Sequence, residues 1–390
     1  MRVALVVHRF PERSEGFLVD HARGLLGEGL DVHVVADAVD RAALADQAPD
    51  LVDRVHACPA GRDRRPRVAL AVAAGTLRAP LATLRYLWRS RPLGRGGAGR
   101  LARDLPLLAL RPDVVHTEFL TLAAARTHLP AVLGRPLTSS VRGYDIAYAG
   151  LDRADAYGGT WPALTALHVL GEDLWQRARA RGCPDTLAHT AIPPAVDADA
   201  VPVADPGPVG PLRLVSVGRL HWKKGHHHVL AALARLRAGG VDAGLTIVGD
   251  GPQIEELAFA RHQLGLDDHV EFVRHLDRRA VWQHLATRHL FVHGAVTEGF
   301  GNAVLEAQAA ALPVVTTDAE GLAENIEPGV TGLLVPRRAP EAMAAAIAEL
   351  AADPERRSAM GRAGRARVAT RFRPADQHAA FAEFFRRAVR

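Results

Sequence analysis

Two series of alternating strand and helix signals, separated by a proline-rich stretch, constrain the fold of this chain most strongly. Short apolar segments typical of strands occur at 2–7, 32–36, 114–116, 137–141 and 166–170, and a helical pattern covers 17–29. A second series starts with a strand at 212–217 and continues to about residue 336, and helices follow from residue 340. Strands that alternate with helices are typical of parallel, doubly wound sheets. The sequence therefore predicts an α/β fold.

Residues 191–211 separate the two series and contain six prolines, which is typical of a linker. A chain of 390 residues can hold two domains of ordinary size, each with its own core. We therefore predict a first domain at 1–190, a linker at 191–211 and a second domain from residue 212 to residue 372.

The charge balance favours anionic partners but does not choose among them. The chain has 48 basic and 43 acidic residues and a pI near 9.7, which suits a nucleotide sugar, an anionic membrane face or nucleic acid. No stretch approaches the roughly 18 apolar residues of a membrane-spanning helix. Cys58 and Cys183 form no motif, and their scarcity suits a reducing compartment. We expect a cytoplasmic protein.

Residues 298–317 are the most informative segment for function. Glu298 and Glu306 lie on either side of the turn Gly299-Phe300-Gly301, and Asn302 can cap a helix over 303–311. Apolar strands are expected before and after it, at 290–292 and 314–316. A strand, a glycine turn and a helix N-terminus form a site for a phosphate, with Glu306 about one helical turn inside the helix.

Carboxylates beside a phosphate site make chemical sense when they bind hydroxyl groups. A nucleotide sugar offers a ribose at one end, a hexose at the other and a diphosphate between them. The alternative is an ordinary capped helix whose glutamates face solvent.

The two lysines of the chain are adjacent, at Lys223 and Lys224, although the chain has 48 basic residues. A lysine retained among so many arginines indicates that a compact ammonium is needed there. Arg219 and Lys224 follow the strand 212–217 and can converge on one diphosphate, the arginine as a fork and the lysine as a point charge. The alternative is a basic surface loop.

Together these motifs resemble the retaining glycosyltransferases of family 4, which have the GT-B fold. Glu298…Glu306 matches the family's E-x7-E segment, and Gly218-Arg219…Lys224-Gly225 matches its G-R-x4-K-G segment. The turn 247–252, which contains Gly251, and the stretch 329–336 match two further family motifs in the correct order.

The resemblance implies two Rossmann-like domains that face each other across a cleft, with a final helix at 373–390 that crosses back to the first domain. It also implies retention at the anomeric carbon, with no metal and no cofactor. Arg219, Lys224 and Glu298 would be catalytic. The donor-binding residues would be Gly218, Gly251, Arg274, Gly299, Phe300, Gly301, Asn302 and Glu306.

The first half carries a weaker resemblance to the same family. Phe10-Pro11-Glu12-Arg13-Ser14-Glu15-Gly16-Phe17 is similar to the F-P-x-x-S-E-T-F opening of the branch that includes colanic-acid and other exopolysaccharide glycosyltransferases, with Gly16 in place of threonine. A dinucleotide fingerprint is absent after the first strand, which counts against an NAD-dependent oxidoreductase.

The acceptor side is predicted from the same half of the chain. Arg142 stands where many family members have histidine in an H-G-x-D segment, and the exopolysaccharide branch tends to have arginine there. The predicted acceptor-side residues are Gly16, His116, Arg142 and Asp145. His116 can equally be a capping residue at the end of a strand.

Residues 60–104 are alternately basic and aliphatic. An amphipathic, arginine-flanked helix in this segment can lie on an anionic membrane and meet a lipid-linked acceptor. A solvated helix that covers the first sheet is the favoured interpretation.

Other motifs do not support metal or nucleic-acid binding. The adjacent side chains of His226, His227 and His228 point in different directions on a helix, so they do not form a metal site. Asp197-Ala198-Asp199 lies in the proline-rich linker, away from any strand–helix turn. The arginines are scattered and no nucleic-acid module is recognisable.

The sequence thus predicts a retaining glycosyltransferase that moves a sugar from a nucleotide diphosphate sugar, with a UDP-sugar favoured. The expected acceptor is a hydroxyl of a saccharide or lipid-linked saccharide in cell-surface polysaccharide synthesis. The alternatives are transfer to a soluble small molecule, such as an aminocyclitol in secondary metabolism, and a sugar-nucleotide epimerase.

Overall fold

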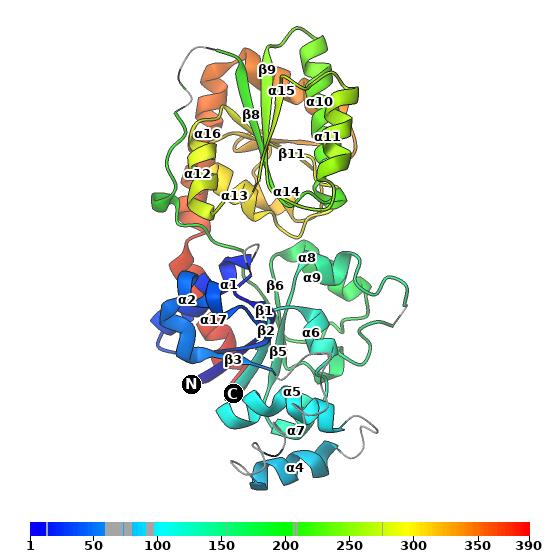
Figure 1. The fold of residues 1–390 in the computed structure, drawn as a ribbon, viewed down its shortest axis with the longest axis vertical. Coiled ribbons are helices and arrows are strands. Elements are labelled where there is room, and N and C mark those ends of the chain that lie inside the picture. The colour runs from blue at the N-terminus through cyan, green and yellow to red at the C-terminus, as the bar shows by residue number, and fades with distance from the viewer. Residues whose placement is uncertain are drawn as a thin grey trace. The chain divides into compact units, whose positions relative to one another are not determined.

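The computed structural model describes residues 1–12, 15–58, 73, 80–90, 97–153, 155–205, 207, 210–274 and 276–390. Over this part the chain divides into two compact units. Unit 1 comprises Met1–Ile192 and His378–Arg390, and unit 2 comprises Pro193–Gln377. Each unit has a parallel sheet with helices packed around it (Figure 1).

The sheet of unit 1 has seven parallel strands in the order β3-β2-β1-β4-β5-β6-β7. Five consecutive buried residues in β1 form the near-continuous apolar run expected of a strand covered on both faces. The strands are β1 (Arg2–Phe10), β2 (Asp31–Val39), β3 (Val55–Ala57), β4 (Val114–Thr117), β5 (Leu137–Val141), β6 (Ala166–Val169) and β7 (His189–Ala191).

Helices connect the strands of unit 1, as parallel pairing requires. They are α1 (Phe17–Gly27), α2 (Arg41–Gln47), η2 (Pro49–Arg54), α4 (Pro80–Ser90), α5 (Gly97–Leu110), α6 (Leu120–Ala124), α7 (Leu129–Leu133), α8 (Gly143–Ala147), η4 (Trp161–Ala163) and α9 (Glu172–Ala180).

Helix α17 (Pro374–Val389) contributes to the core of unit 1 although it is far away in sequence. Phe381, Phe384 and Phe385 are buried and belong to one apolar cluster with residues of β1, β2 and α1. Figure 1 shows α17 beside this sheet, close to α1 and α2. Helix α17 is therefore part of the core of unit 1, and replacing one of these buried rings with alanine is expected to cost about 3–5 kcal/mol of stability.

The sheet of unit 2 has six parallel strands in the order β10-β9-β8-β11-β12-β13. These are β8 (Leu212–Val217), β9 (Ala243–Val248), β10 (Val270–Val273), β11 (Leu290–His293), β12 (Val314–Thr317) and β13 (Gly332–Val335). The helices are η5 (Ala198–Ala200), η6 (Trp222–Lys224), α10 (His226–Ala238), α11 (Ile254–Gln263), α12 (Arg278–Ala286), α13 (Asn302–Ala309), α14 (Leu322–Asn325), α15 (Pro340–Ala352) and α16 (Pro354–Arg371).

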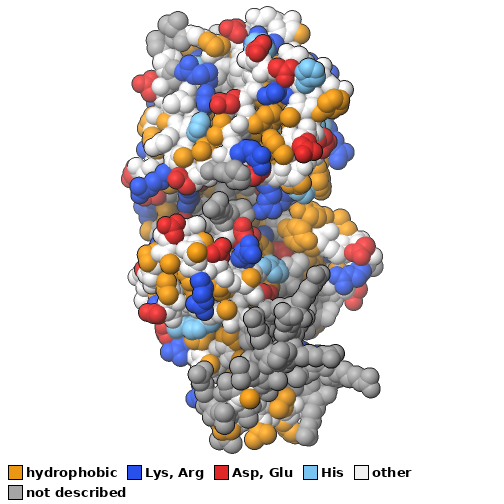
Figure 2. Space-filling view, in the orientation of Figure 1, with side chains coloured by type: hydrophobic (Ala, Val, Ile, Leu, Met, Phe, Trp, Pro, Cys, Tyr) orange, Lys and Arg blue, Asp and Glu red, His pale blue; other side chains and the backbone are white. Residues whose placement is uncertain are grey.

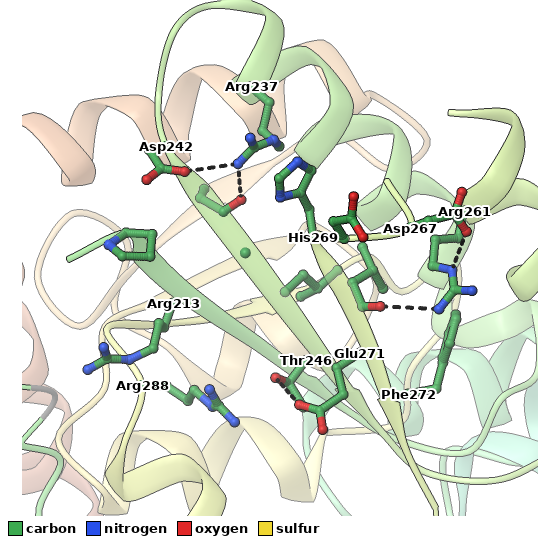
Figure 3. Close-up of a pocket in the computed structure, with 16 residues that line it drawn as sticks. Arg213, Arg237, Asp242, Thr246, Arg261, Asp267, His269, Glu271, Phe272 and Arg288 are labelled. Atoms are coloured by element: carbon green, nitrogen blue, oxygen red, sulfur yellow. Dashed lines mark hydrogen bonds and ion pairs between the residues drawn. The ribbon is translucent and has the colours of Figure 1, made fainter. Parts of the chain in front are cut away.

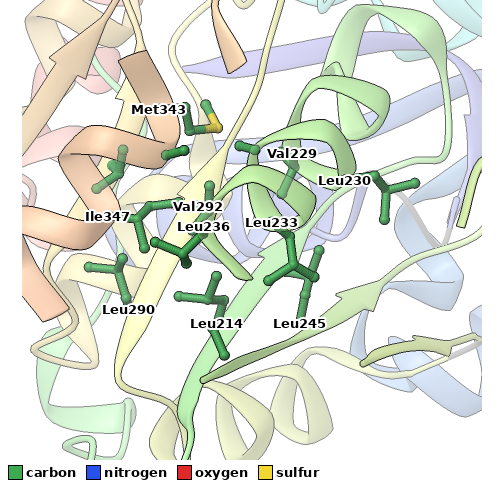
Figure 4. Packing of buried hydrophobic residues seen from close by; sticks show 14 of the residues in the cluster. Leu214, Val229, Leu230, Leu233, Leu236, Leu245, Leu290, Val292, Met343 and Ile347 are labelled. Atoms are coloured by element: carbon green, nitrogen blue, oxygen red, sulfur yellow. The ribbon is translucent and has the colours of Figure 1, made fainter. Parts of the chain in front are cut away.

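Helices α10 and α15 pack on the strands of unit 2 through leucine, valine and isoleucine side chains (Figure 4). In α10 the buried residues Val229, Leu230, Leu233 and Leu236 recur at helical spacing, which places them on one face. Helix α13 packs against α16 and also contacts β11 and β12. This packing fixes the strand ends from which the site loops start.

The expected strands are confirmed to within a few residues at each end. The helix expected over 303–311 begins one residue earlier, at Asn302. Part of the arginine-rich segment 60–104 lies outside the described residues, and α4 and α5 come from its remaining part.

Candidate functional site

Strands β8 and β11 are neighbours at the centre of the sheet of unit 2, where the strand order reverses direction. In open α/β sheets, ligands bind outside the carboxyl ends of the strands at such a reversal. The loop after β8 carries Arg219 and Lys224, and the loop after β11 carries Glu298. The topology therefore brings together residues that are more than 70 positions apart.

Lys224 and Glu298 form an ion pair through Nζ and Oε2, and both side chains are largely buried. Gly225, which follows Lys224, has a φ of +62°, and a Cβ there would lie 1.8 Å from the carbonyl oxygen of Gly294. The N–H of Val296 also donates to the carbonyl of Lys223 at 2.8 Å. The two loops are thus joined through their backbones, which holds the ion pair in place.

Glu298 is ionised in this environment. Burial alone would raise the pKa of its carboxyl. Lys224 and His293 lower it by more, so the pKa of Glu298 lies well below its ordinary value. His293, at the end of β11, lies 3.4 Å from Glu298 Oε2 and is 1% exposed. Burial lowers the pKa of His293. Sequence reasoning missed His293, although its position at a strand end was a usable signal.

Helix α13 begins differently from the expectation. Asn302 does not cap it; the N-cap is Gly301, which has a φ of +90° and no side chain to donate or accept. The buried Asn325 fixes the turn instead, because its Nδ2 donates to the carbonyls of Phe300 at 2.8 Å and Gly301 at 3.0 Å. The first N–H groups of α13 consequently have no side-chain cap.

Phe300 contributes to the core rather than to a binding surface. Its side chain is 4% exposed, and its ring contacts Phe372 edge-on with centroids 5.8 Å apart. Only its backbone is placed to serve as a donor-binding group. Gly299, beside it, is also buried.

Two further predicted donor residues have partners that the sequence did not reveal. Glu306 accepts a hydrogen bond from Nε of Arg278 at 3.0 Å, and the Arg278 guanidinium lies over the Trp282 ring. Arg274 is exposed and bonds to Asp250 at 2.8 Å. Arg278, the partner of Glu306, begins α12, and no motif marks it.

The loop after β8 has a strongly positive electrostatic character. Arg219 is exposed, and a Cβ added at Gly218 would lie 3.6 Å from the aliphatic stem of Lys224. Burial lowers the pKa of Lys223, and the charges of Lys224 and Arg219 lower it further while Glu298 opposes the shift. An anion near these residues would relieve this mutual repulsion. Gly251, after β9, donates its N–H to its neighbour Asp250 at 2.8 Å.

In unit 1, Arg142 is the predicted acceptor-side residue with the most defined geometry. It is the N-cap of α8, and its Nη2 lies 2.7 Å from Oε2 of Glu118, whose side chain is fully buried. Its guanidinium carbon lies 4.3 Å from the Phe17 ring centroid. Sequence reasoning did not identify Glu118 as its partner. Gly16 is exposed at the N-cap of α1, where a Cβ would meet nothing within 4 Å.

His116, which the sequence offers as an acceptor-side or a strand-end residue, lies inside unit 1. Its side chain is fully buried, with Nδ1 2.9 Å from Thr138 Oγ1 and Nε2 2.9 Å from Ser140 Oγ. Ser140 Oγ also lies 2.8 Å from His168 Nδ1, and His168 Nε2 donates to the carbonyl of Ile192. Burial lowers the pKa of both imidazoles to about 3. His116 is thus a core residue of this network.

Asp145 likewise has a structural role. Its buried carboxylate accepts hydrogen bonds from the N–H groups of Arg142 at 3.0 Å and Thr121 at 3.1 Å. Burial raises the pKa of this carboxyl, although the same N–H groups oppose the shift. Asp145 has no exposed surface in this structure, and its acceptor-side role remains a prediction.

A cavity of about 610 Å³ in unit 2 lies at the amino ends of β8, β9 and β10 (Figure 3). The predicted donor residues follow the carboxyl ends of strands, so this cavity is not the predicted donor site. Four arginines and four carboxylates line it: Arg213, Arg237, Arg261, Arg288, Asp242, Asp267, Asp268 and Glu271. These opposite charges balance, so the cavity has no net charge that would select an anion.

Within the described ranges, no group of three or more histidine, cysteine, aspartate or glutamate residues could hold a metal ion. The same part of the chain contains no helix long and apolar enough to cross a membrane. Cys58 and Cys183 are both free and buried.

Comparison with known proteins finds similarity to glycosyltransferases, strongest in unit 2. Residues 205–367 match the family model of glycosyl transferases group 1. An amylovoran biosynthesis glycosyltransferase of Erwinia amylovora is 27% identical over 407 residues, covering 98% of this chain and 97% of that protein. The predicted resemblance to glycosyltransferases that include the exopolysaccharide branch is therefore confirmed.

A GDP-mannose-dependent alpha-(1-6)-phosphatidylinositol monomannoside mannosyltransferase of Mycobacterium tuberculosis is 34% identical over 212 residues. The match covers 50% of this chain, and it spans only about half, 55%, of the length of that relative. The crystal structure of Anabaena Alr3699/HepE in complex with UDP-glucose matches with a TM-score of 0.76 at 17% identity, over 99% of this chain and 100% of that one. This likeness confirms the GT-B fold.

Proposed function

We propose that this protein, whose residues 205–367 match the model of glycosyl transferases group 1, transfers a sugar from a nucleotide diphosphate sugar to a hydroxyl acceptor with retention. The observation that carries the proposal is the largely buried Lys224–Glu298 pair at the β8–β11 reversal, which lies beside the start of α13, where no side chain caps the helix. A cation, free N–H groups and a fixed carboxylate suit a diphosphate joined to a sugar.

Each predicted residue has a defined task in this proposal. As the bond between the anomeric carbon and the diphosphate breaks, negative charge grows on the leaving oxygens. Arg219, Lys224 and the N–H groups at Gly301 and Asn302 stabilise that charge. Glu306 holds the ribose hydroxyls and Glu298 orients the sugar ring. The acceptor oxygen bonds to the anomeric carbon on the face that the diphosphate leaves, and its proton passes to the diphosphate.

A UDP-sugar is the favoured donor and a saccharide or lipid-linked saccharide the favoured acceptor. A neighbour of the same fold binds UDP-glucose, whereas one relative depends on GDP-mannose, so both bases belong in the test. The Erwinia relative serves amylovoran biosynthesis, which supports a role in cell-surface polysaccharide synthesis. Transfer to a soluble small molecule is the second candidate. Release of free nucleotide without transfer would instead indicate an epimerase.

Thermal unfolding with UDP, GDP, ADP, TDP or pyrophosphate, without added metal, tests the donor site. A nucleotide present at 100 times its Kd adds about 2.7 kcal/mol, which raises Tm by about 5–10 °C for a unit of this size. Glu306→Gln should remove the advantage of the nucleotide over pyrophosphate, because the ribose hydroxyls lose a carboxylate. If none of these ligands stabilises the wild type, the donor-site assignment is wrong.

We also propose that α4 contacts an anionic membrane surface, where a lipid-linked acceptor would lie. Leu84, Leu87 and Trp88 share one helical face and are 62%, 39% and 65% exposed. On the other side of α4, Tyr86 is buried and its hydroxyl donates to Asp104 at 2.7 Å. Figure 2 shows hydrophobic side chains at the surface in this part of unit 1.

The charge around α4 suits anionic lipid. The sequence from residue 64 to residue 103 has ten arginines and no aspartate or glutamate. Basic residues near an anionic leaflet contribute about 1 kcal/mol each, and the apolar face of the helix supplies a second attraction. The two interpretations of this segment are therefore compatible, because α4 covers unit 1 with one face and exposes the other.

Co-sedimentation with vesicles tests this contact. Wild type should bind vesicles of phosphatidylcholine with phosphatidylglycerol, and binding to phosphatidylcholine alone should be much weaker. Leu84→Ser/Trp88→Ser should weaken binding at least about tenfold, since each large apolar side chain contributes about 1.5–3 kcal/mol when buried. Phe259→Ser, which alters a 62% exposed residue on α11, is the matched control and should bind as wild type does. Equal binding by both variants would contradict the contact.

A further inference from the structure

The loop after β12 holds the main chain of Glu298 from two sides. The N–H of Glu298 donates to Oε2 of Glu320 at 2.9 Å, and the N–H of Gly321 donates to the carbonyl of Glu298 at 3.4 Å. A Cβ at Gly321 would lie 2.1 Å from the carbonyl oxygen of Gly299, so the two loops touch backbone to backbone. The Glu298 peptide is therefore fixed at both its N–H and its carbonyl.

Arg337, which follows β13, holds Glu320 in turn. Its Nη1 lies 3.1 Å from Oε1 of Glu320, and its Nε lies 3.4 Å from Asp318 Oδ1. The same Nη1 lies 3.5 Å from the carbonyl of Val296, on the loop that carries Glu298. Glu320 is 17% exposed, so its carboxylate is partly desolvated and balanced by the guanidinium. Arg337 thus connects the loops after β11, β12 and β13.

The backbone of Glu320 adopts a conformation that disfavours side chains. Its φ is +28°, in the region where glycine is the usual residue. A glutamate there costs conformational energy, which the contacts to Glu298 and Arg337 offset. Strained residues of this kind concentrate at functional sites, where the surrounding structure holds them in place.

We propose that Glu320 is a positioning residue for Glu298. Its carboxylate holds the Glu298 peptide so that the Glu298 side chain faces Lys224 and, on the proposed function, the transferred sugar. Glu320 does not touch the donor in this scheme. Removing it should therefore affect the rate of sugar transfer more than the binding of the nucleotide, which depends on Arg219, Lys224 and Glu306.

The full-length protein with Glu320→Gly tests the proposal, because glycine relieves the φ of +28° while it removes the carboxylate. We expect kcat to fall about tenfold, as for the loss of one hydrogen bond to a charged group. The KM for the donor sugar nucleotide and the Tm shift given by its nucleoside diphosphate should stay as in wild type. Glu320→Gln keeps an acceptor oxygen and should recover most of the rate.

Arg338→Gly is the matched control, since Arg338 has a φ of +59° and is adjacent to Arg337. It should leave kcat unchanged. A wild-type kcat in Glu320→Gly would overturn the proposal. An equal loss of kcat and nucleotide binding would also overturn it, because that pattern indicates general damage to unit 2.

Hydrogen exchange at the Glu298 amide separates this proposal from the proposed function. Glu320→Gly should exchange this amide about tenfold faster, because its acceptor is gone. If this amide exchanges faster in Glu320→Gly but the wild type neither binds nucleotides nor transfers sugar, the positioning contact is supported and the proposed function is refuted. Unchanged exchange would refute the contact whatever the reaction is.

Discussion

Replacing Lys224 with alanine is expected to slow sugar transfer at least about a hundredfold, because one well-placed charge on a developing anion contributes about 3 kcal/mol. The ammonium of Lys224 is paired with Glu298 in a largely buried position, so no water-exposed group can substitute for it. Initial rates with a donor that the thermal screen has identified provide the measurement.

Lys223→Ala is the matched control for Lys224→Ala, since it removes the neighbouring lysine of the same loop. The carbonyl of Lys223 that accepts from Val296 remains in that variant, so the loop contact is kept. Circular dichroism and Tm should show both variants folded. His293 lies 3.4 Å from Glu298 and can balance the carboxylate when Lys224 is absent. Near-normal turnover by Lys224→Ala would refute the catalytic assignment.

Acid is expected to destabilise unit 1 strongly between pH 7.5 and pH 5.5, through His116 and His168. Burial lowers the pKa of both to about 3 in the folded protein, whereas the ordinary value is 6.5. The unfolded chain therefore takes up protons below pH 6.5 that the folded chain does not. The stabilisation is complete above pH 6.5 and is lost as the pH falls from 6.5 toward 3. At pH 5.5 the two sites together cost roughly 3 kcal/mol.

The hydrogen bonds explain why neither imidazole accepts a second proton readily. The Ile192 carbonyl requires a proton on Nε2 of His168, so Nδ1 accepts from the Ser140 hydroxyl. The Ser140 oxygen then accepts from Nε2 of His116, and Nδ1 of His116 accepts from Thr138. Each ring is satisfied only when neutral.

Urea unfolding of unit 1 at the two pH values measures this effect. His21, a third buried imidazole of unit 1, also has its pKa lowered by burial to about 3, so His168→Gln should lose only about a third of the pH dependence that these three groups give. His262→Gln, on the surface of α11, should keep the wild-type dependence of unit 1. A free energy of unfolding that is the same at both pH values would show that the histidines are protonated in the folded state.

The proximity of Lys224 and Glu298 follows from one rule that the sequence can supply. The carboxyl ends of the parallel neighbours β8 and β11 lie at the same edge of the sheet, so the loops that follow them start side by side. Lys224 and Glu298 each lie a few residues after an apolar segment that is recognisable as a strand in the sequence. The roles assigned to them, and to Arg219 and Glu306, remain predictions.

The partners of those residues could not be predicted, because they come from elements with no motif. Arg278 begins α12, Asn325 ends α14 and Glu320 stands in a loop, and each reaches the site only through tertiary packing. The sequence also did not show which polar side chains near strand ends are buried. His116 and Asp145 have the same sequence context as a surface residue, and only the fold shows that their side chains face inward.

The turn before α13 illustrates a local limit of the same kind. Asn302 is a good capping residue by type, yet the left-handed conformation of Gly301 places the cap one position earlier. Propensity identified the helix, and the backbone geometry of one glycine determined where it starts.

The position of α17 in the core of unit 1 has a consequence for biosynthesis. Residues 1–192 leave the ribosome first, but their apolar cluster includes Phe381 and Phe385, which are made almost two hundred residues later. Unit 2 is continuous in sequence, so all residues of its core are synthesised before the three phenylalanines of α17 that complete the core of unit 1. During translation the nascent first unit therefore exposes apolar surface for longer than the second, and it is the part of the chain with the greater need for a chaperone.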